Sequence, residues 1–335
     1  MGIRCYAVYK AGEKLREFRY EEPKQLGPME AVIKISHCGI CHSDIHLIDN
    51  DWQISQYPLV PGHEIVGTVE RIGQDVKDLK IGQRAGVGWQ AGSCMRCEWC
   101  LRGEENLCAD DVATAVGHYG GFAEKVMVDS RFAFPIPEEI DSQTAAPLLC
   151  GGITVYSPLR RLVKAADKVG VIGIGGLGHF ALQFAHGMGC EVTAFSHTPD
   201  KVQEAKQLGA DYFVSSTDKS WLEKLKRRFD FLLTTVNVNL DWAMYLSMLR
   251  PNGRLIVVGA VPEPLEVPAG AIISGQKGVI ASVIGSPSLI RDMLAFVARH
   301  NIRAQTEVLP LKEVNTAVEK VRQGKARYRM VLQVN

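Results

Sequence analysis

The sequence predicts an α/β protein in which a doubly wound parallel sheet is joined to a second, β-rich domain. Three observations predict this fold class: a glycine-rich turn between a strand and a helix within residues 169–189, an alternation of strands and helices from there to residue 299, and short strands with many turns before residue 151. A chain of 335 residues is also longer than a domain with one ordinary hydrophobic core. Two domains are therefore expected.

The β-rich domain is expected to take in both ends of the chain. Residues 1–151 show little helical period, and "GKARYRMVLQV" at residues 324–334 reads as one more strand after the alternating segment. We therefore assign residues 1–151 and 288–335 to the β-rich domain, and residues 152–287 to the domain with the parallel sheet.

A glycine-rich turn follows the first strand of the parallel sheet, which is expected at residues 169–172. A helix with apolar positions every three or four residues then runs to Gly189. Backbone amides at the start of such a helix bind a pyrophosphate. The segment therefore predicts a Rossmann dinucleotide-binding domain. Its cofactor-binding candidates in the turn are Gly173, Gly175, Gly176, Leu177 and Gly178.

The second strand, residues 191–196, ends without the acidic residue that binds the ribose 2′-hydroxyl of NAD. Ser196, His197 and Thr198 stand there instead, and Asp200 is expected to cap the next helix. The hydroxyls of Ser196 and Thr198 and the ammonium of Lys201 are donors that suit a 2′-phosphate. NADPH is therefore favoured over NADH, with a solvated Lys201 as the alternative interpretation.

Strands and helices continue to alternate after this point. The expected helices are residues 200–208, 221–227, 241–249 and 289–299, and the expected strands are residues 212–215, 231–236, 254–258 and 279–284. This alternation predicts a parallel sheet whose carboxyl edge carries the cofactor. The binding candidates at that edge are Thr235, Val258, Gly259, Ala260 and Val283.

Four cysteines gather within the β-rich part of the chain. Their spacing is C-x2-C-x2-C-x7-C, and the residues between them are mostly polar, so a role in core packing is excluded. In a reducing compartment this pattern predicts a closed structural zinc site of four thiolates, which performs no chemistry because no coordination position is left for a substrate. The predicted ligands are Cys94, Cys97, Cys100 and Cys108. A redox cluster is the alternative.

A second set of metal ligands is distributed over three fragments. "CGICHSDIH" supplies Cys41, "PGHE" supplies His63 and Glu64, and "LLCGGIT" supplies Cys150. Two thiolates and one imidazole leave the fourth position of zinc open to substrate, which is the arrangement of a catalytic site. Each fragment alone is a weak signal, and the four-cysteine segment just downstream strengthens it. The remaining cysteines, Cys5, Cys38 and Cys190, are expected to be buried core thiols.

Composition excludes several classes of partner. Lys and Arg number 38 against 37 Asp and Glu, so no field steers the chain toward nucleic acid or an anionic membrane. The N-terminal segment has no apolar signal region, and no stretch is long and apolar enough to span a bilayer. A small-molecule partner and a reducing, cytoplasmic setting are expected.

With these motifs in order, the sequence resembles the zinc-containing medium-chain alcohol dehydrogenases over nearly its whole length. The stretches "CGICHSDIH", "YPLVPGHEIVG", "GSCMRCEWCLRGEENLC", "GIGGLGH" and "ARYRMVL" look like the cinnamyl alcohol dehydrogenase branch. "TTVNVNLDW" and "VGAVPEPLEVPAGAIISG" look nearer to bacterial NADPH-dependent aldehyde reductases. The resemblance implies a GroES-like fold for the β-rich catalytic domain.

The resemblance also implies roles for single residues. Asp44 would orient the His63 imidazole, and Glu64 would be able to exchange onto the metal. Ser43 and His46 would pass a proton to solvent through the nicotinamide ribose. His42 would be a basic residue near the pyrophosphate, and Thr154 would lie near the nicotinamide. Arg329 would contact a phosphate of the cofactor, and Trp52 would be an aromatic wall of the substrate pocket. Arg327 is the alternative to Arg329, and an exposed loop position is the alternative for Trp52.

The expected function is zinc-dependent reduction of aldehydes to primary alcohols with NADPH, by hydride transfer to a carbonyl that zinc polarises. Two zinc ions per chain and a homodimer are expected. One alternative is an NAD-dependent alcohol or polyol dehydrogenase that works in the oxidative direction. An alternative of another class is a nucleotide-binding protein without turnover.

Overall fold

The computed structural model describes residues 2–334, and the chain divides into two compact units. Unit 1 is Met1–Ile153 with Ile284–Asn335, and unit 2 is Thr154–Val283. The domain boundaries derived from the sequence, at 151/152 and 287/288, stay a prediction. Within residues 2–334 no helix has both the length and the apolar character that a membrane crossing requires.

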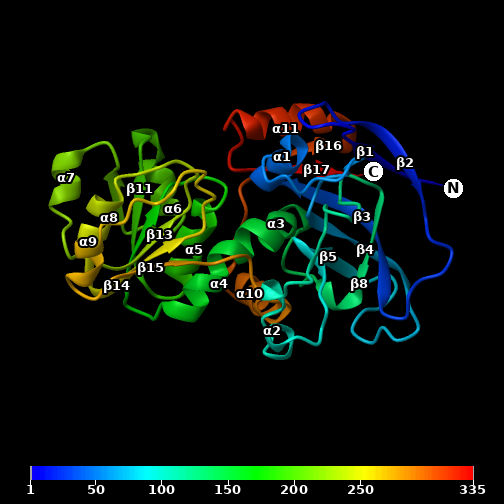
Figure 1. Ribbon diagram of the computed structural model, residues 1–335, viewed down its shortest axis with the longest axis horizontal. Coiled ribbons are helices and arrows are strands. Elements are labelled where there is room, and N and C mark those ends of the chain that lie inside the picture. Colours follow the sequence, from blue (N-terminus) through cyan, green and yellow to red (C-terminus); the bar gives the residue numbers. More distant parts are fainter. Residues whose placement is uncertain (1, 335) are drawn as a thin grey trace. The chain divides into compact units, whose positions relative to one another are not determined.

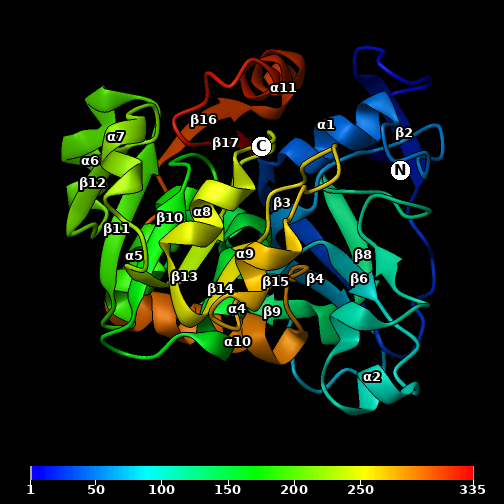
Figure 2. The same cartoon turned by 60° about the vertical axis from the view of Figure 1, so that its left-hand side comes forward.

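Unit 2 is a six-stranded sheet with helices on both of its faces (Figures 1 and 2). The strand order is β12-β11-β10-β13-β14-β15, and every neighbouring pair is parallel. This is the doubly wound order, so the predicted α/β class is confirmed. The elements are α4 (Ile153–Leu162), β10 (Lys168–Ile172), α5 (Gly178–Gly187), β11 (Glu191–Ser196), η4 (Pro199–Lys201), α6 (Val202–Gln207), β12 (Tyr212–Ser215), α7 (Lys219–Glu223), β13 (Phe229–Thr234), α8 (Trp242–Met248), β14 (Leu249–Val257), α9 (Ala269–Ile273) and β15 (Gly278–Ala281).

The turn between β10 and α5 depends on glycine. Gly173 has a φ of 93°, which favours glycine, and a Cβ on Gly178 would lie 1.9 Å from the carbonyl oxygen of Gly173. The apolar face predicted for the helix is buried, with Phe180, Ala181 and Phe184 fully enclosed. Because the strand order reverses between β10 and β13, the loops after these two strands form the edge at which such sheets bind ligands.

Unit 1 is β-rich and is built around a seven-stranded sheet. Its path is β16-β17-β3-β4-β5-β9, with β8 paired to β3. The elements are β1 (Gly2–Ala7), β2 (Arg16–Glu21), β3 (Glu30–Ile40), α1 (His42–Asp49), β4 (Glu64–Ile72), β5 (Arg84–Val87), β6 (Gln90–Gly92), α2 (Glu98–Leu101), η1 (Glu105–Leu107), β7 (Val112–Ala113), β8 (Lys125–Asp129), η2 (Ser130–Phe132), β9 (Ala133–Pro135), α3 (Ser142–Pro147), η3 (Leu148–Gly152), α10 (Pro287–His300), β16 (Thr306–Pro310), η5 (Leu311–Glu313), α11 (Val314–Arg322) and β17 (Arg329–Gln333).

The antiparallel pairing of β3 with β4 positions Cys41, His63 and Glu64, three of the residues predicted for the catalytic zinc site. Gly39, near the end of β3, lies opposite Glu64, the first residue of β4. Apolar side chains of both strands, such as Ile33, Ile35 and Val69, are buried in the core of this unit. The register therefore brings the residues that follow β3 beside those that precede β4.

Several elements differ from the sequence-based expectation. The predicted helix 221–227 is α7, which begins at Lys219 because the Asp218 carboxylate accepts a hydrogen bond from the amide of Trp221 at 3.1 Å. Asp200 does not cap the next helix as predicted. It lies inside η4, whose first turn follows Thr198 and starts with Pro199. The short helices α1, α3 and α9 have no counterpart in the prediction. Cys5, Cys38 and Cys190 are buried, as predicted.

Candidate metal and nucleotide sites

The four cysteines of the predicted structural zinc site lie together in a small lobe of unit 1. This lobe contains α2, which Figure 1 labels. Their sulfurs are 3.5 Å (Cys97 to Cys100), 3.8 Å (Cys97 to Cys108) and 3.9 Å (Cys94 to Cys100) apart. Four sulfurs bound tetrahedrally to one zinc at about 2.3 Å are about 3.8 Å from each other. Backbone amides of Arg96 and Cys97 lower the pKa of the Cys94 thiol to about 6, which favours the thiolate that a metal binds. The donor set fits zinc.

A second cluster combines Cys41, His63, Glu64 and Cys150, whose ligand atoms lie within 4.8 Å of one another. Cys41 follows β3, His63 precedes β4, and Cys150 comes from η3, the single π-helical turn after α3. The sulfurs of Cys41 and Cys150 are 3.8 Å apart, and His63 Nε2 is 3.2 Å from Cys150 Sγ. A hydrogen bond from Cys150, together with His63, holds the pKa of Cys41 well below its usual range. The structure thus brings together all three predicted zinc ligands and Glu64.

Asp44, on the first turn of α1, organises this cluster. Its carboxylate is fully buried and accepts hydrogen bonds from the amides of Cys41 (2.8 Å) and Gly62 (2.9 Å). Its Oδ1 also lies 2.9 Å from Nδ1 of His63, so Nδ1 carries the proton and the lone pair of Nε2 is left for a metal. The carboxylate therefore fixes the orientation and the tautomer that a zinc-binding imidazole needs.

Glu64 is buried beside these ligands and forms an ion pair with Arg329, which comes from the C-terminal part of unit 1. One carboxylate oxygen, Oε1, accepts from Arg329 Nη2, whereas Oε2 has no hydrogen-bond partner within residues 2–334. Burial raises the pKa of Glu64 to about 7, although Arg329 opposes the shift. An unpartnered oxygen within the cluster fits a carboxylate that is able to approach a metal. Arg329 itself is 6% exposed, and its predicted phosphate contact stays a prediction.

An arc of rings runs from the metal cluster toward the surface of unit 1. The ring of Trp89 lies 5.0 Å from that of His63, Trp52 lies 6.1 Å from Trp89, and His46 lies 5.0 Å from Trp52. Trp52 lies in a turn after α1 and is 37% exposed, which agrees with the alternative of an exposed loop position, although its ring contacts those of His46 and Trp89. Sequence reasoning named Trp52 and missed Trp89, which follows β5 by two residues. Both rings are placed to form an apolar wall near His63.

A chain of polar groups on α1 also begins at the cluster. Ser43 Oγ lies 3.6 Å from Cys41 Sγ, and His46 is one helical turn further on. His46 Nδ1 is 2.7 Å from a carboxylate oxygen of Asp51, which is half exposed. Asp51 was missed in the sequence, because a carboxylate five residues after a histidine is no recognised motif. The ring of His42 lies 5.2 Å from His46, and its predicted contact with a pyrophosphate is untested.

The glycine-rich turn of unit 2 presents free amide groups. The amides of Gly175, Gly176 and Leu177 donate no hydrogen bond to any acceptor within residues 2–334. A Cβ added to Gly175 would meet no atom within 4 Å, so the space in front of the turn is open. Such a cradle at the start of a helix fits the pyrophosphate of a dinucleotide. At the end of β11, buried Ser196 accepts a hydrogen bond from the amide of Thr198 at 3.1 Å. The ammonium of Lys201 is not merely solvated, since it donates to the carbonyl of Ile174 at 2.6 Å.

The other predicted cofactor residues lie in loops at the carboxyl edge of the sheet or close to it. Thr235 follows β13, while Val258, Gly259 and Ala260 follow β14, and Val283 is 53% exposed after β15. Thr154 is half-buried in the first turn of α4 and His197 is exposed after β11. Their contacts with a cofactor stay predictions.

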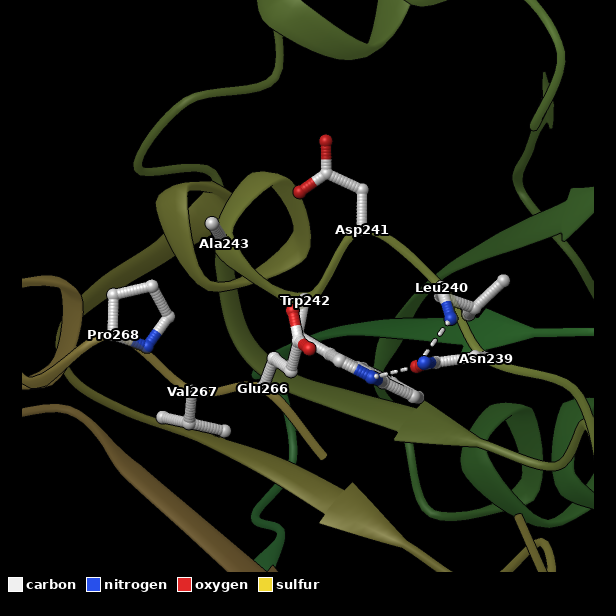
Figure 3. Close-up of a pocket in the computed structure, with 8 residues that line it drawn as sticks. All are labelled: Asn239, Leu240, Asp241, Trp242, Ala243, Glu266, Val267 and Pro268. Atoms are coloured by element: carbon white, nitrogen blue, oxygen red, sulfur yellow. Dashed lines mark hydrogen bonds between the residues drawn. The ribbon is translucent and has the colours of Figure 1, made fainter. Parts of the chain in front are cut away.

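A cavity of ≈ 530 Å³ in unit 2 involves none of the predicted site residues (Figure 3). Asn239 Oδ1 accepts hydrogen bonds from the indole of Trp242 (2.6 Å) and the amide of Leu240 (3.1 Å), and the Asp241 carboxylate caps α8. The side chains of Asn239 and Asp241 in this cavity therefore already serve the local fold.

A dinucleotide-type sheet together with a Cys-His-Cys cluster that fits a metal ion is typical of the metal-dependent dehydrogenases. Family models for the alcohol dehydrogenase GroES-like domain and the zinc-binding dehydrogenase match residues 27–138 and 176–299. The chain belongs to the zinc-containing medium-chain alcohol dehydrogenases, in the cinnamyl alcohol dehydrogenase branch. Unit 1 carries the GroES-like fold and unit 2 the Rossmann fold, as predicted.

Individual relatives agree with this placement. The aldehyde reductase AdhA of Synechocystis sp. is 45% identical, over 98% of this chain and 98% of that protein. The structure of a cinnamyl alcohol dehydrogenase from Sorghum bicolor matches with a TM-score of 0.94 and 38% identity, over 99% and 98% of the two chains. A cinnamyl alcohol dehydrogenase from Helicobacter pylori, solved with NADP(H), matches with a TM-score of 0.90 and 33% identity, again over 99% and 98%. The chain is thus an alcohol or aldehyde dehydrogenase.

Proposed function

We propose that this protein reduces aldehydes to primary alcohols with NADPH. Cys41, His63 and Cys150 would hold the catalytic zinc, and the four cysteines of the lobe would hold a second, structural zinc. The observation that carries the proposal is the Cys-His-Cys cluster, because its three protein donors leave one position of a tetrahedral ion for substrate. When bound, zinc would polarise the carbonyl and NADPH would supply the hydride.

The residues of the chain have separate tasks in this reaction. Asp44 holds the His63 imidazole in the tautomer that leaves Nε2 available. Trp89 and Trp52 border the site with apolar rings, which excludes water and favours an apolar substrate. Ser43, beside Cys41, and His46, paired with Asp51, provide hydroxyl and imidazole groups that move a proton between the product oxygen and solvent.

Replacing His46 with Gln is expected to lower kcat by about 10- to 100-fold, the lower end of general acid–base contributions, because the proton path is interrupted. Asp51→Asn removes the charge that orients His46 and is expected to have a smaller effect in the same direction. The measurement is steady-state kcat with and without added imidazole, which would restore part of the His46→Gln rate. A rate that neither substitution changes would exclude this path.

The preference for NADPH rests on the end of β11. The strand itself ends without a carboxylate that would repel a 2′-phosphate, and Asp200 follows only within η4. Ser196, Thr198 and Lys201 offer donors. The link between Lys201 and the carbonyl of Ile174 keeps its ammonium at the glycine-rich turn. The solved relative from Helicobacter pylori with NADP(H) supports this cofactor.

We expect kcat/KM with NADPH to exceed that with NADH by about 10-fold or more, the size of one hydrogen bond to a charged group. Lys201→Met should remove most of this preference by weakening NADPH selectively, whereas Lys206→Met, on the neighbouring helix α6, should leave it unchanged. Rates with both cofactors at one aldehyde concentration give the answer. A preference of the unmodified protein for NADH would instead favour the NAD-dependent alcohol or polyol dehydrogenase.

A panel of aromatic, medium aliphatic and short aldehydes, ranked by kcat/KM, would identify the substrate class. One methylene changes discrimination by only about 1–3 kcal/mol, so several chain lengths are needed. The homodimer and the cytoplasmic setting stay predictions.

A further inference from the structure

Two side chains beneath the glycine-rich turn of unit 2 bind its carbonyl groups. They are Thr235, from the loop after β13, and His179, from the first turn of α5, and we call them the anchoring pair. Both touch the backbone of the turn and belong to different elements. They therefore connect the turn to the adjacent strand on one side and to its own helix on the other.

Thr235 is enclosed by the turn. Its Oγ1 lies 3.0 Å from the carbonyl oxygen of Ile172 and 3.1 Å from that of Gly173, so its proton is donated to this pair of carbonyls. The same Oγ1 lies 3.1 Å and 3.3 Å from the positions that a Cβ on Gly173 or Gly178 would take. The hydroxyl thus fills the space where the two glycines meet.

His179 acts on the other end of the turn. Its side chain is fully buried, and Nδ1 lies 3.1 Å from the carbonyl oxygen of Gly175. Because a carbonyl only accepts, Nδ1 carries the proton. The ring of Phe180 lies 4.0 Å away and packs against the imidazole.

The anchored carbonyls leave the amides of the turn available. The carbonyls of Ile172, Gly173 and Gly175 are bound by the protein, while the amides of Gly175, Gly176 and Leu177 have no acceptor within residues 2–334. We propose that the anchoring pair holds the turn in its anion-binding conformation before the cofactor arrives. Thr235 and His179 are then positioning residues for the pyrophosphate, and neither needs to touch it. This proposal rests on the dinucleotide site of the proposed function but not on the choice of NADPH.

Preorganisation of the turn predicts a defined pattern of affinities. Thr235→Val removes the hydroxyl at nearly constant volume, and its Kd should rise about 5- to 10-fold for NADPH and NADH alike, the size of one lost hydrogen bond. Thr235→Ser keeps the hydroxyl and should bind both cofactors like the unmodified protein. His179→Leu should weaken both cofactors in the same way, and His179→Asn, which keeps a donor near Nδ1, should restore binding. The affinity for adenosine 2′-monophosphate, which has no pyrophosphate, should not change.

The experiment is a fluorescence titration of the full-length, zinc-loaded protein with NADPH and NADH, and competition by adenosine 2′-monophosphate. Unchanged Kd values for Thr235→Val and His179→Leu would overturn the proposal. A loss confined to NADPH would also overturn it, because it would indicate contact with the 2′-phosphate. If Thr235→Val does not fold, His179→Leu and His179→Asn still test the proposal. If His179→Leu does not fold, Thr235→Val and Thr235→Ser test it. Failure of the NADPH preference is visible separately, as equal or reversed affinities of the unmodified protein for the two cofactors.

Discussion

A Cys41→Ala variant is expected to retain one zinc per chain, held in the lobe around α2, and to lose aldehyde reductase activity by more than about 1000-fold. In the proposed function Cys41 would supply one of the three protein donors to the catalytic zinc, and its sulfur lies 3.8 Å from that of Cys150. A Lewis acid contributes several kcal/mol to the stabilisation of developing charge, and each 1.36 kcal/mol corresponds to about tenfold in rate. Zinc content by atomic emission and the rate of NADPH oxidation with an aldehyde measure the two effects.

Cys190→Ala is the matched control for this substitution. Cys190 is a buried thiol of unit 2 that belongs to neither cluster, so its loss should leave two zinc ions and a nearly normal rate. If Cys41→Ala kept the rate of the unmodified protein, the assignment of the catalytic site would be wrong. If it lost both metals, the two sites would not be independent.

A Cys97→Ser variant is expected to lose the other zinc and to be destabilised, with a nearly unchanged catalytic rate. The sulfur of Cys97 lies within 3.8 Å of both Cys100 and Cys108, in a lobe whose helices α2 and η1 have only four and three residues. Elements this short depend on the metal for their order, since zinc binding supplies folding free energy. We expect the thermal midpoint of unit 1 to fall by about 10 °C or more, because each kcal/mol corresponds to about 2–4 °C in a unit of about 150–250 residues.

Differential scanning fluorimetry gives the midpoint, and kcat per catalytic zinc at low temperature tests whether the chemistry survives. Arg102→Ala is the control, because it changes the same lobe but leaves all four thiols in place. It removes exposed ion pairs with Glu98 and Glu104, worth about 0–1 kcal/mol, and the contact of the guanidinium with the Trp99 ring, worth about 0.5–1 kcal/mol. A Cys97→Ser variant with two zinc ions and an unchanged midpoint would contradict the structural role of this site.

The sequence was most informative where a few neighbouring residues specify both the structure and its use. The spacing of Cys94, Cys97, Cys100 and Cys108 and the strand, turn and helix around Gly173–Gly178 are local patterns, because thiolates on one metal and amides at one helix start come from adjacent residues. The end of β11 at Ser196 was predicted for the same reason.

The predicted bounds of helices were wrong where a single side chain decides where the helix begins. The start of α7 depends on Asp218, and Asp200 lies in a turn that begins after Thr198 rather than at a helix cap. Short helices such as α1 contain too few residues to show a period. Capping and tertiary packing decide whether such short segments form a helix and where the helix begins, and both depend on one or two residues at a time.

The sequence by itself therefore determined the two-domain α/β class, the residues that gather in the two candidate metal clusters and the position of the glycine-rich turn. Only the tertiary structure decided two other meetings of distant groups: Arg329 with Glu64 over 265 positions, and Thr235 with the carbonyls of Ile172 and Gly173. The physical reason is that these contacts depend on strand register and on buried polar groups finding partners, neither of which leaves a periodic trace in the chain.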